Sequence, residues 1–138
     1  MKTNELRIGN YISFHNVWYK IVGIEKDRVL IEYHNGETDY CWIDYIEPIE
    51  LTEEVLLKIG FKKNKYDWWE YFPDRENEIS ILMSGEYTTI EYANLFHCPE
   101  DVTEVNYGSA LEFPRRIHLH ELQNAYFLMS NQEMEVNL

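Results

Sequence analysis

The chain has 138 residues, of which 45% are hydrophobic and 15% aromatic, and its formal net charge is −13 at pH 7. This length suits one domain or two very small ones, and the apolar content excludes a disordered chain. No stretch approaches the roughly 18 apolar residues of a membrane span, and the opening residues lack a signal-peptide pattern, so we expect a soluble, cytoplasmic protein.

The first 50 residues alternate short β-type runs with turn signals. The expected strands are residues 6–14, 17–25, 28–33 and 38–46. Asn35-Gly36, between the last two, is typical of a type I′ hairpin turn, in which both central residues have positive φ. Several short strands at this spacing favour a small SH3-like β-barrel for residues 1–50.

The clearest helix signal lies at about residues 52–59. Thr52 is the expected N-cap, and Gly60 is the expected left-handed residue that ends the helix. This helix opens a second, acidic α+β subdomain, residues 51–138. The alternative that the whole chain is one continuous domain stays open.

The second subdomain repeats the alternation between about residues 67 and 113, which predicts an antiparallel meander. A second helix is expected at about residues 118–129, because apolar residues recur there at intervals of three and four: Leu119, Leu122, Tyr126 and Met129. The expected fold class is therefore α+β and mostly β. It comprises an N-terminal SH3-like barrel, a short helix, and an antiparallel sheet covered by a C-terminal helix.

The negative charge is concentrated in this second subdomain. Residues 66–138 carry 14 acidic and three basic side chains, and residues 76–114 contain eight acids with neither lysine nor arginine. Such a field repels phosphate backbones, so a nucleic-acid partner is not expected. It favours a basic protein partner, although solubility alone is the plainer explanation of the charge.

Motifs for catalysis and for cofactor binding are missing from the sequence. It contains no P-loop, no dinucleotide-binding glycine pattern and no nucleophile elbow, so we expect no catalytic residue and no cofactor. Cys41 and Cys98 are isolated thiols that we expect to be buried and free, with a single disulfide as the alternative.

The segment from His118 to Glu121 holds the best set of metal-ligand side chains. Residues i and i+2 of a helix point in different directions, which argues against a shared ion. If His118 precedes the helix, however, its ring and that of His120 could converge, with His97 or Cys98 as a further ligand. A metal-dependent hydrolase or nuclease using His118 and His120 is therefore the alternative hypothesis, and the main expectation is no metal site.

Trp68 and Trp69 are the aromatic candidates for a binding surface. Adjacent residues of a strand face opposite sides, so one ring leaves the main core, and tryptophan is enriched at binding hot spots. Acids of the base-free segment and two polar residues of the second helix complete the candidate partner-binding set: Trp68, Trp69, Glu100, Asp101, Glu104, His120 and Asn124.

Three segments carry a resemblance to a known group. They are Asn4-Glu5-Leu6-Arg7-Ile8-Gly9-Asn10, the stretch from Pro48 to Phe61, and His120-Glu121-Leu122-Gln123-Asn124-Ala125-Tyr126-Phe127. Together they resemble small uncharacterised proteins encoded in gut-bacterial genomes, prophages and phages. The resemblance implies a cytoplasmic, phage-associated accessory protein and implies no particular chemistry.

The expected function is non-enzymatic binding of another protein through the acidic half. Weak nucleic-acid binding by the barrel is a further alternative, based on the lysines near the first helix: Lys58, Lys62, Lys63 and Lys65. The plainer interpretation of that basic cluster is a solvated loop. A homo-oligomer stays open, and the sequence does not identify the partner.

Overall fold

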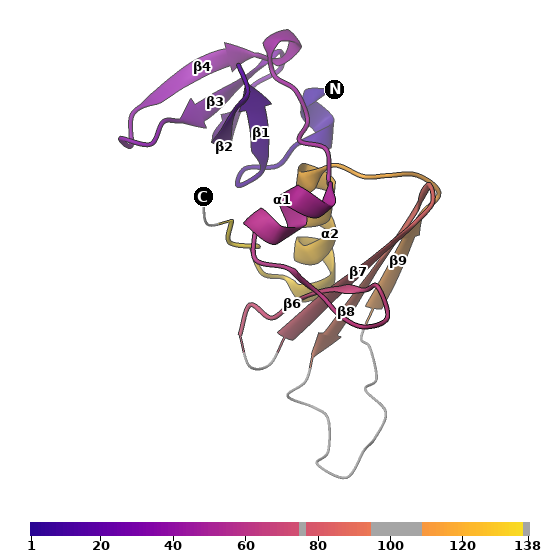
Figure 1. The fold of residues 1–138 in the computed structure, drawn as a ribbon. Helices are drawn as coiled ribbons and strands as arrows, with labels where there is room; N and C mark the ends of the chain where they lie inside the picture. The colour runs from indigo at the N-terminus through magenta and orange to yellow at the C-terminus, as the bar shows by residue number, and fades with distance from the viewer. Residues whose placement is uncertain (75–76, 95–108, 137–138) are drawn as a thin grey trace. The chain divides into compact units, whose positions relative to one another are not determined.

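The computed structural model describes residues 1–74, 77–94 and 109–136 (Figure 1). These residues form two antiparallel sheets and two α-helices, which confirms the α+β, mostly β class. The chain divides into two compact units, residues 1–50 with 118–124 and residues 51–117 with 125–138. The division therefore falls inside the second helix.

Neither of the helices in the described part of the chain has the length and apolar character that crossing a membrane requires.

The first unit contains a four-stranded meander, seen at the indigo end of the ribbon in Figure 1. Its strands are hydrogen-bonded in chain order: β1 (Tyr11–Phe14), β2 (Val17–Ile24), β3 (Arg28–Glu32) and β4 (Thr38–Trp42). One 3-10 turn precedes the sheet and one follows it: η1 (Thr3–Glu5) and η2 (Ile43–Tyr45). A buried apolar cluster contains five residues of these strands and two residues outside them: Ile12, Ile21, Val29, Ile31, Cys41, Leu6 and Ile46.

The meander is an open sheet. Within residues 1–50, all of which are described, β1 and β4 are not paired with each other. After η2 the chain returns to β1 at a single bridge, where the N–H groups of Ser13 and Glu47 donate to each other's carbonyls at 2.9 and 2.8 Å. No closed barrel is found, so the SH3-like barrel stays a prediction.

The Asn35-Gly36 turn is not of type I′, so that prediction is wrong. Only Gly36 has positive φ, at 85°, and its N–H donates to the Tyr33 carbonyl at 2.9 Å. The Tyr33 N–H donates in turn to the Glu37 carbonyl at 2.7 Å, which makes the three-residue loop with a glycine bulge. Two consecutive positive φ values, 51° and 62°, occur instead at His15-Asn16 between β1 and β2.

Both ends of the first helix are set by the expected residues. Helix α1 (Glu53–Lys58) begins after Thr52, whose hydroxyl accepts a hydrogen bond from a backbone N–H of the first turn at 3.2 Å. Gly60 ends it with a φ of 105°, and the Phe61 N–H donates to the Leu56 carbonyl at 2.9 Å. These bonds satisfy groups that a helix end leaves unpaired, so the local sequence is sufficient to define this helix.

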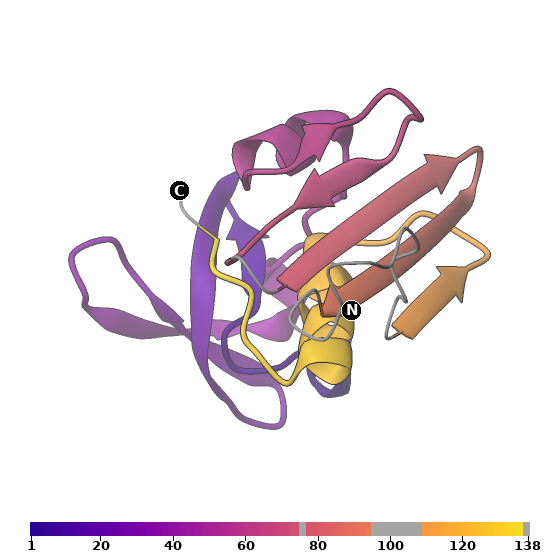
Figure 2. The same ribbon diagram turned by 90° about the horizontal axis from the view of Figure 1, so that it is seen from below.

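The second unit contains a five-stranded antiparallel meander, also in chain order (Figure 2). Its strands are β5 (Lys62–Lys63), β6 (Trp69–Tyr71), β7 (Asn77–Ser84), β8 (Tyr87–Asn94) and β9 (Ser109–Phe113). Of the expected solvated loop at residues 62–65, Lys62 and Lys63 form an edge strand paired with β6, and both side chains are exposed. Residues 95–108 of the expected meander lie outside the described residues.

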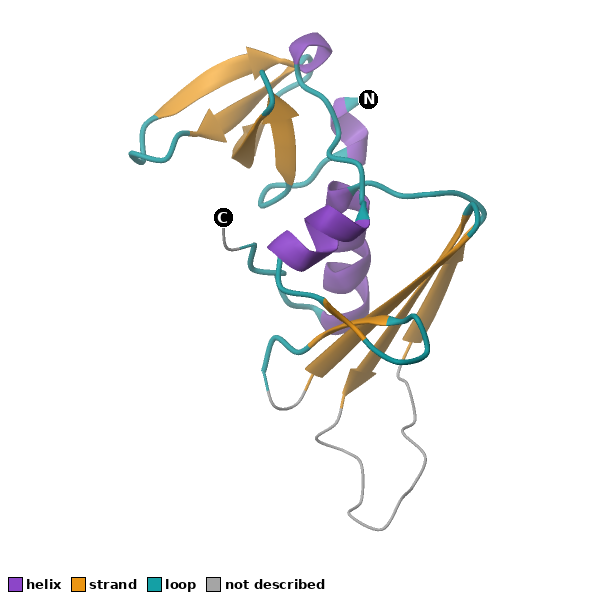
Figure 3. Cartoon of the chain, in the orientation of Figure 1, coloured by secondary structure: helices purple, strands orange, loops and turns teal. Residues whose placement is uncertain are grey.

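Helix α2 (Leu119–Ser130) is present where the apolar periodicity predicts it (Figure 3). In the second unit, the completely buried Tyr126 meets the Tyr92 ring edge-on, with the centroids 6.2 Å apart. Tyr92 pairs across the sheet with Ile79, so this face of β7 and β8 is the one that residues 125–130 of α2 cover. Because neighbouring residues alternate, Ser80 and Glu91 point to the opposite face.

Candidate functional site

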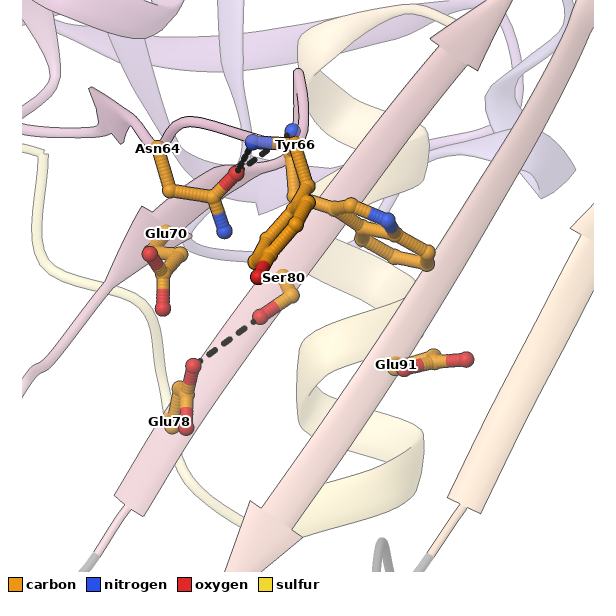
Figure 4. A pocket seen from close by; sticks show the side chains of 7 residues that line it. Asn64, Tyr66, Glu70, Glu78, Ser80 and Glu91 are labelled. Atoms are coloured by element: carbon orange, nitrogen blue, oxygen red, sulfur yellow. Dashed lines mark hydrogen bonds between the residues drawn. The ribbon is translucent and has the colours of Figure 1, made fainter.

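A hollow of about 280 Å³ lies on the sheet face opposite Tyr126 (Figure 4). It is lined by side chains from β6, β7, β8 and the loop before β6: Asn64, Tyr66, Trp68, Glu70, Glu78, Ser80 and Glu91. The set combines two aromatic rings with three carboxyl groups, a hydroxyl and an amide. None of these described side chains is basic.

The loop that carries the two aromatic residues is held by Asn64. Its side-chain oxygen accepts hydrogen bonds from the backbone N–H groups of Tyr66 and Trp68, at 2.8 and 3.1 Å. The Asn64 N–H donates to the Trp68 carbonyl at 2.7 Å, and Asp67 adopts a φ of 67°. An asparagine that binds the following backbone in this way fixes a tight turn. Tyr66 and Trp68 are therefore presented from a defined loop.

Glu78 and Ser80 form the floor of the hollow. They are only 8% and 5% exposed because β7 is the central strand of the sheet, with neighbours on both sides. The Ser80 hydroxyl donates to the Glu78 carboxylate at 3.1 Å, and Figure 4 shows Glu70 beside Glu78.

Burial is the main cause that raises the pKa of Glu78 above its ordinary value. A hydrogen bond with the Glu70 carboxyl group raises the pKa further, and the negative charges of Glu70 and Glu91 act in the same direction. A carboxyl group in these surroundings retains its proton at a pH where an isolated glutamate has lost it. Glu78 is therefore the carboxyl group of the hollow that holds its proton more tightly than an isolated glutamate does.

Replacing Glu78 by glutamine is expected to increase stability at pH 7.5 and to change it little at pH 4. The folded protein holds the Glu78 proton more tightly than the unfolded chain does, so the wild-type protein loses stability as pH rises above about 4.5. Urea unfolding at both pH values measures the difference. Glu86→Gln, at an exposed position in the same unit, is the matched control, and an equal response of both variants would contradict the assignment.

This combination of groups suits a compact cation. An ammonium group has three donors and no acceptor, and it is attracted both to carboxylates and to the faces of aromatic rings. One such ammonium–ring contact already exists in the chain: the Lys65 ammonium lies 4.9 Å from the centroid of the ring of Tyr66, which lines the hollow. Trp68, Glu70 and Glu91 are each partly exposed and can be contacted by a ligand from outside.

The two adjacent tryptophans fall on opposite sides of the sheet, as their alternation predicts. Trp68 is half-buried and lines the hollow, whereas Trp69 is 4% exposed and pairs with the buried Ile81. Trp69 is therefore a core residue and offers almost no surface to a partner. All three acidic candidates lie outside the described residues: Glu100, Asp101 and Glu104.

The histidine cluster forms the start of α2. Glu121 reaches back to the residue before the helix, accepting from the His118 N–H at 3.1 Å and contacting its ring Nδ1 at 2.9 Å. This is the carboxylate half of a capping box. The rings of His118 and His120 stack with their centroids 5.7 Å apart, but His120 is only 3% exposed. Burial removes it as a contact residue for a partner.

Among the described residues, no group of three or more His, Cys, Asp or Glu side chains is arranged to hold a metal ion. Cys41 is a buried free thiol, as expected, and burial raises its pKa. His97 and Cys98, named as further ligands, are not among the described residues.

Asn124 is engaged within the first unit. Its side-chain oxygen accepts from the amide of Asn10 at 2.9 Å and from the Arg7 guanidinium at 3.2 Å, and its amide donates to the Glu5 carbonyl at 3.2 Å. The neighbouring Gln123 also binds this N-terminal segment. These contacts give Asn124 a structural role, which explains its polarity without a partner.

The sequence analysis missed most of the hollow. Glu70, Glu78 and Glu91 were not singled out, because their proximity depends on the pairing of β6, β7 and β8. A local signal did exist, since Glu78 and Ser80 alternate with buried isoleucines and so mark one face of a strand. The four lysines considered for nucleic-acid binding all lie in the second unit, not in the N-terminal sheet: Lys58, Lys62, Lys63 and Lys65.

Comparison with known proteins identified no relative of this chain. No family model matches the chain, and neither a curated protein nor a solved structure matches it significantly. The site is therefore interpreted from its own geometry.

Proposed function

We propose that this protein is a non-enzymatic binding module that takes a lysine side chain of a basic partner protein into the hollow of the second unit. The observation that carries the proposal is the combination of the Glu70–Glu78 carboxyl pair with the half-buried Trp68. A lysine stem can lie against the indole while its ammonium group reaches the carboxyl pair and the Ser80 hydroxyl.

Lysine fits this floor better than arginine does. The hydrogen-bonding groups at the bottom, Glu78 and Ser80, are nearly inaccessible, so a narrow head group on a flexible stem is needed to reach them. The arriving ammonium would also favour release of the Glu78 proton. Binding should therefore strengthen as pH rises through the raised pKa of Glu78.

The net charge of −13 supports a basic partner, because it attracts such proteins over a distance and repels nucleic acid. In keeping with the resemblance of its three segments, we place the protein among cytoplasmic, phage-associated accessory proteins. The partner in this proposal is a protein of the same compartment, and self-association is not needed for the hollow to form, since all lining residues belong to one chain.

We expect the peptide Ac-Gly-Gly-Lys-Gly-Gly-NH2 to bind and to shift the indole N–H signal of Trp68 in a two-dimensional NMR titration at low salt. The peptide carrying Nε-acetyl-lysine should cause no such shift, because acetylation removes the charge. Glu70→Gln should weaken binding about threefold to tenfold at this signal, as expected for one charged contact. Trp68→Ala, followed at the backbone amide signal of Ser80 instead, should weaken binding by a similar factor, as expected for one cation–π contact.

Glu86→Gln is the matched control, since it removes the same charge from an exposed turn of the same sheet and should leave binding unchanged. Equal shifts with the acetylated peptide would contradict the charge-based proposal. A complete lack of response to the lysine peptide at 10–20 mM ionic strength, about the lowest practical screening, would also overturn it.

For the first unit we propose the architecture of a small SH3-like barrel. Three features support it: the four-stranded meander, the 3-10 turn η2 after β4, and the return of the chain to β1 at the bridge between Ser13 and Glu47. This architecture carries no functional conclusion by itself, because one fold serves many activities.

A further inference from the structure

An arginine of β3 lies over an aromatic ring of β4 and near a second one. The Arg28 guanidinium carbon lies 3.9 Å from the centroid of the Tyr40 ring and 5.9 Å from that of Trp42. Its Nε donates to the Glu25 carboxylate at 2.7 Å. Hydrogen bonds from Arg28 and from the Tyr40 hydroxyl hold the pKa of Glu25 below its ordinary value. Arg28 thus contacts an aromatic ring and forms an ion pair with Glu25, in which its positive charge is balanced by the carboxylate.

Next to this group, and sharing Trp42 with it, is a hollow of about 350 Å³ whose five lining residues include two carboxylates and no basic side chain. It is lined by Asp27, Trp42, Ile43, Asp44 and Tyr45. Trp42 and Tyr45 are 54% and 67% exposed, so both rings are accessible to a ligand. The Ile43 N–H of η2 donates to the carbonyl of Asp27, the residue before β3, at 2.9 Å. This bond holds the backbone of η2 beside the backbone of Asp27.

We propose that this hollow is a second docking surface of the protein and that it binds an arginine side chain of a partner protein. The guanidinium would lie against Trp42 or Tyr45 and pair with Asp27 and Asp44, as Arg28 lies against Tyr40 and pairs with Glu25. Arginine is favoured over lysine here because the rings are open and a planar guanidinium stacks on them while still binding carboxylates.

The negative charge of the hollow favours an arginine side chain over the bases of a nucleic acid. Exposed aromatic rings also stack on nucleobases, but a single strand would bring its phosphates close to Asp27 and Asp44. Addition of a partner strand along the open edge of β4 is disfavoured as well, because the Asp39 carboxylate already accepts from the Tyr40 N–H at 2.8 Å. With a nucleic-acid strand and an added β-strand both disfavoured, a cationic side chain is the ligand that fits this hollow best.

The test is an NMR titration of the full chain with Ac-Gly-Arg-Gly-NH2, following the indole N–H signal of Trp42, assigned with a Trp42→Phe variant. We expect a saturable shift with this peptide and none with the citrulline peptide, which has the same shape without the charge. The double variant D27N/D44N should weaken binding about fivefold, as expected for two exposed charge contacts.

A matched double variant, E37Q/E50Q, removes the same charge from exposed positions of the first unit and should bind like the wild type. The inference is overturned if the citrulline peptide shifts Trp42 equally, if the control variant weakens binding as much as D27N/D44N, or if no peptide moves the signal. Lysine binding to the hollow of the second unit is measured separately, at the Trp68 indole signal. Either proposal can therefore be rejected without affecting the other.

Discussion

Replacing Gln123 by alanine is expected to lower the free energy of unfolding by about 2–4 kcal/mol. The Gln123 side chain is completely buried in the first unit. Its oxygen accepts from the Tyr11 N–H at 2.9 Å, and its amide donates to the Gly9 carbonyl at 3.0 Å. Alanine would leave both backbone groups without these bonds and would open a cavity where the amide had been.

Urea unfolding of the purified protein measures this change. Gln132→Ala is the matched control, because Gln132 is exposed and its side chain makes one long contact, accepting from the Tyr126 hydroxyl at 3.4 Å. The control should change stability by about 0.5 kcal/mol or less. A similar small effect for Gln123→Ala would mean that water replaces the amide, and the structural role given to Gln123 would then be wrong.

The amide contacts also give two of the resembling segments a physical role. Residues 4–10 and residues 120–127 are far apart in the sequence, yet Gln123 and Asn124 bind Gly9 and Asn10 directly within the first unit. Asn10 is completely buried, so its polar groups need such partners. The hydrogen bonds of these polar residues within the fold account for their presence, so no role in an active site is needed to explain them.

Local features of the fold could be predicted from the sequence because a few neighbouring residues determine them. The ends of α1 follow from Thr52 and Gly60, and the buried stripe of α2 follows from the spacing of Leu119, Leu122 and Tyr126. The loop at Asn35-Gly36 was mispredicted because the same dipeptide fits two hairpin types. The choice between them depends on how the strands beyond the turn are paired.

The candidate site could not be predicted in the same way. Glu70, Ser80 and Glu91 become neighbours only through the register of three strands, which pairs Glu70 with Ser80 and Ser80 with Glu91. A shift of one residue would bury Glu91 and expose Ile90 instead. Sequence alternation indicates which residues share a face of one strand, but it does not indicate which residues of the next strand lie beside them.

Replacing Tyr126 by phenylalanine is expected to protect the protein against alkaline unfolding. Burial, aided by Tyr92 and Asp74, raises the pKa of Tyr126 to about 12, from an ordinary value of 10.0. The unfolded chain therefore loses this proton at a lower pH than the folded protein does. Between about pH 10 and pH 12 unfolding releases the Tyr126 proton, so stability falls by about 1.4 kcal/mol per pH unit, about 3 kcal/mol in all.

The measurement is urea unfolding of wild type and Tyr126→Phe from pH 8 to pH 12, with the difference between them followed against pH. Other tyrosines and the lysines titrate in both proteins, so their effects cancel in this difference. Tyr87→Phe, at a ring that is 56% exposed, should show no such pH-dependent gain. Parallel curves for wild type and Tyr126→Phe would mean that the phenolate is as well accommodated in the fold as in water. The ring of Tyr126 would then not be sealed between α2 and the sheet, and the packing that separates the core face from the face with the hollow would have to be revised.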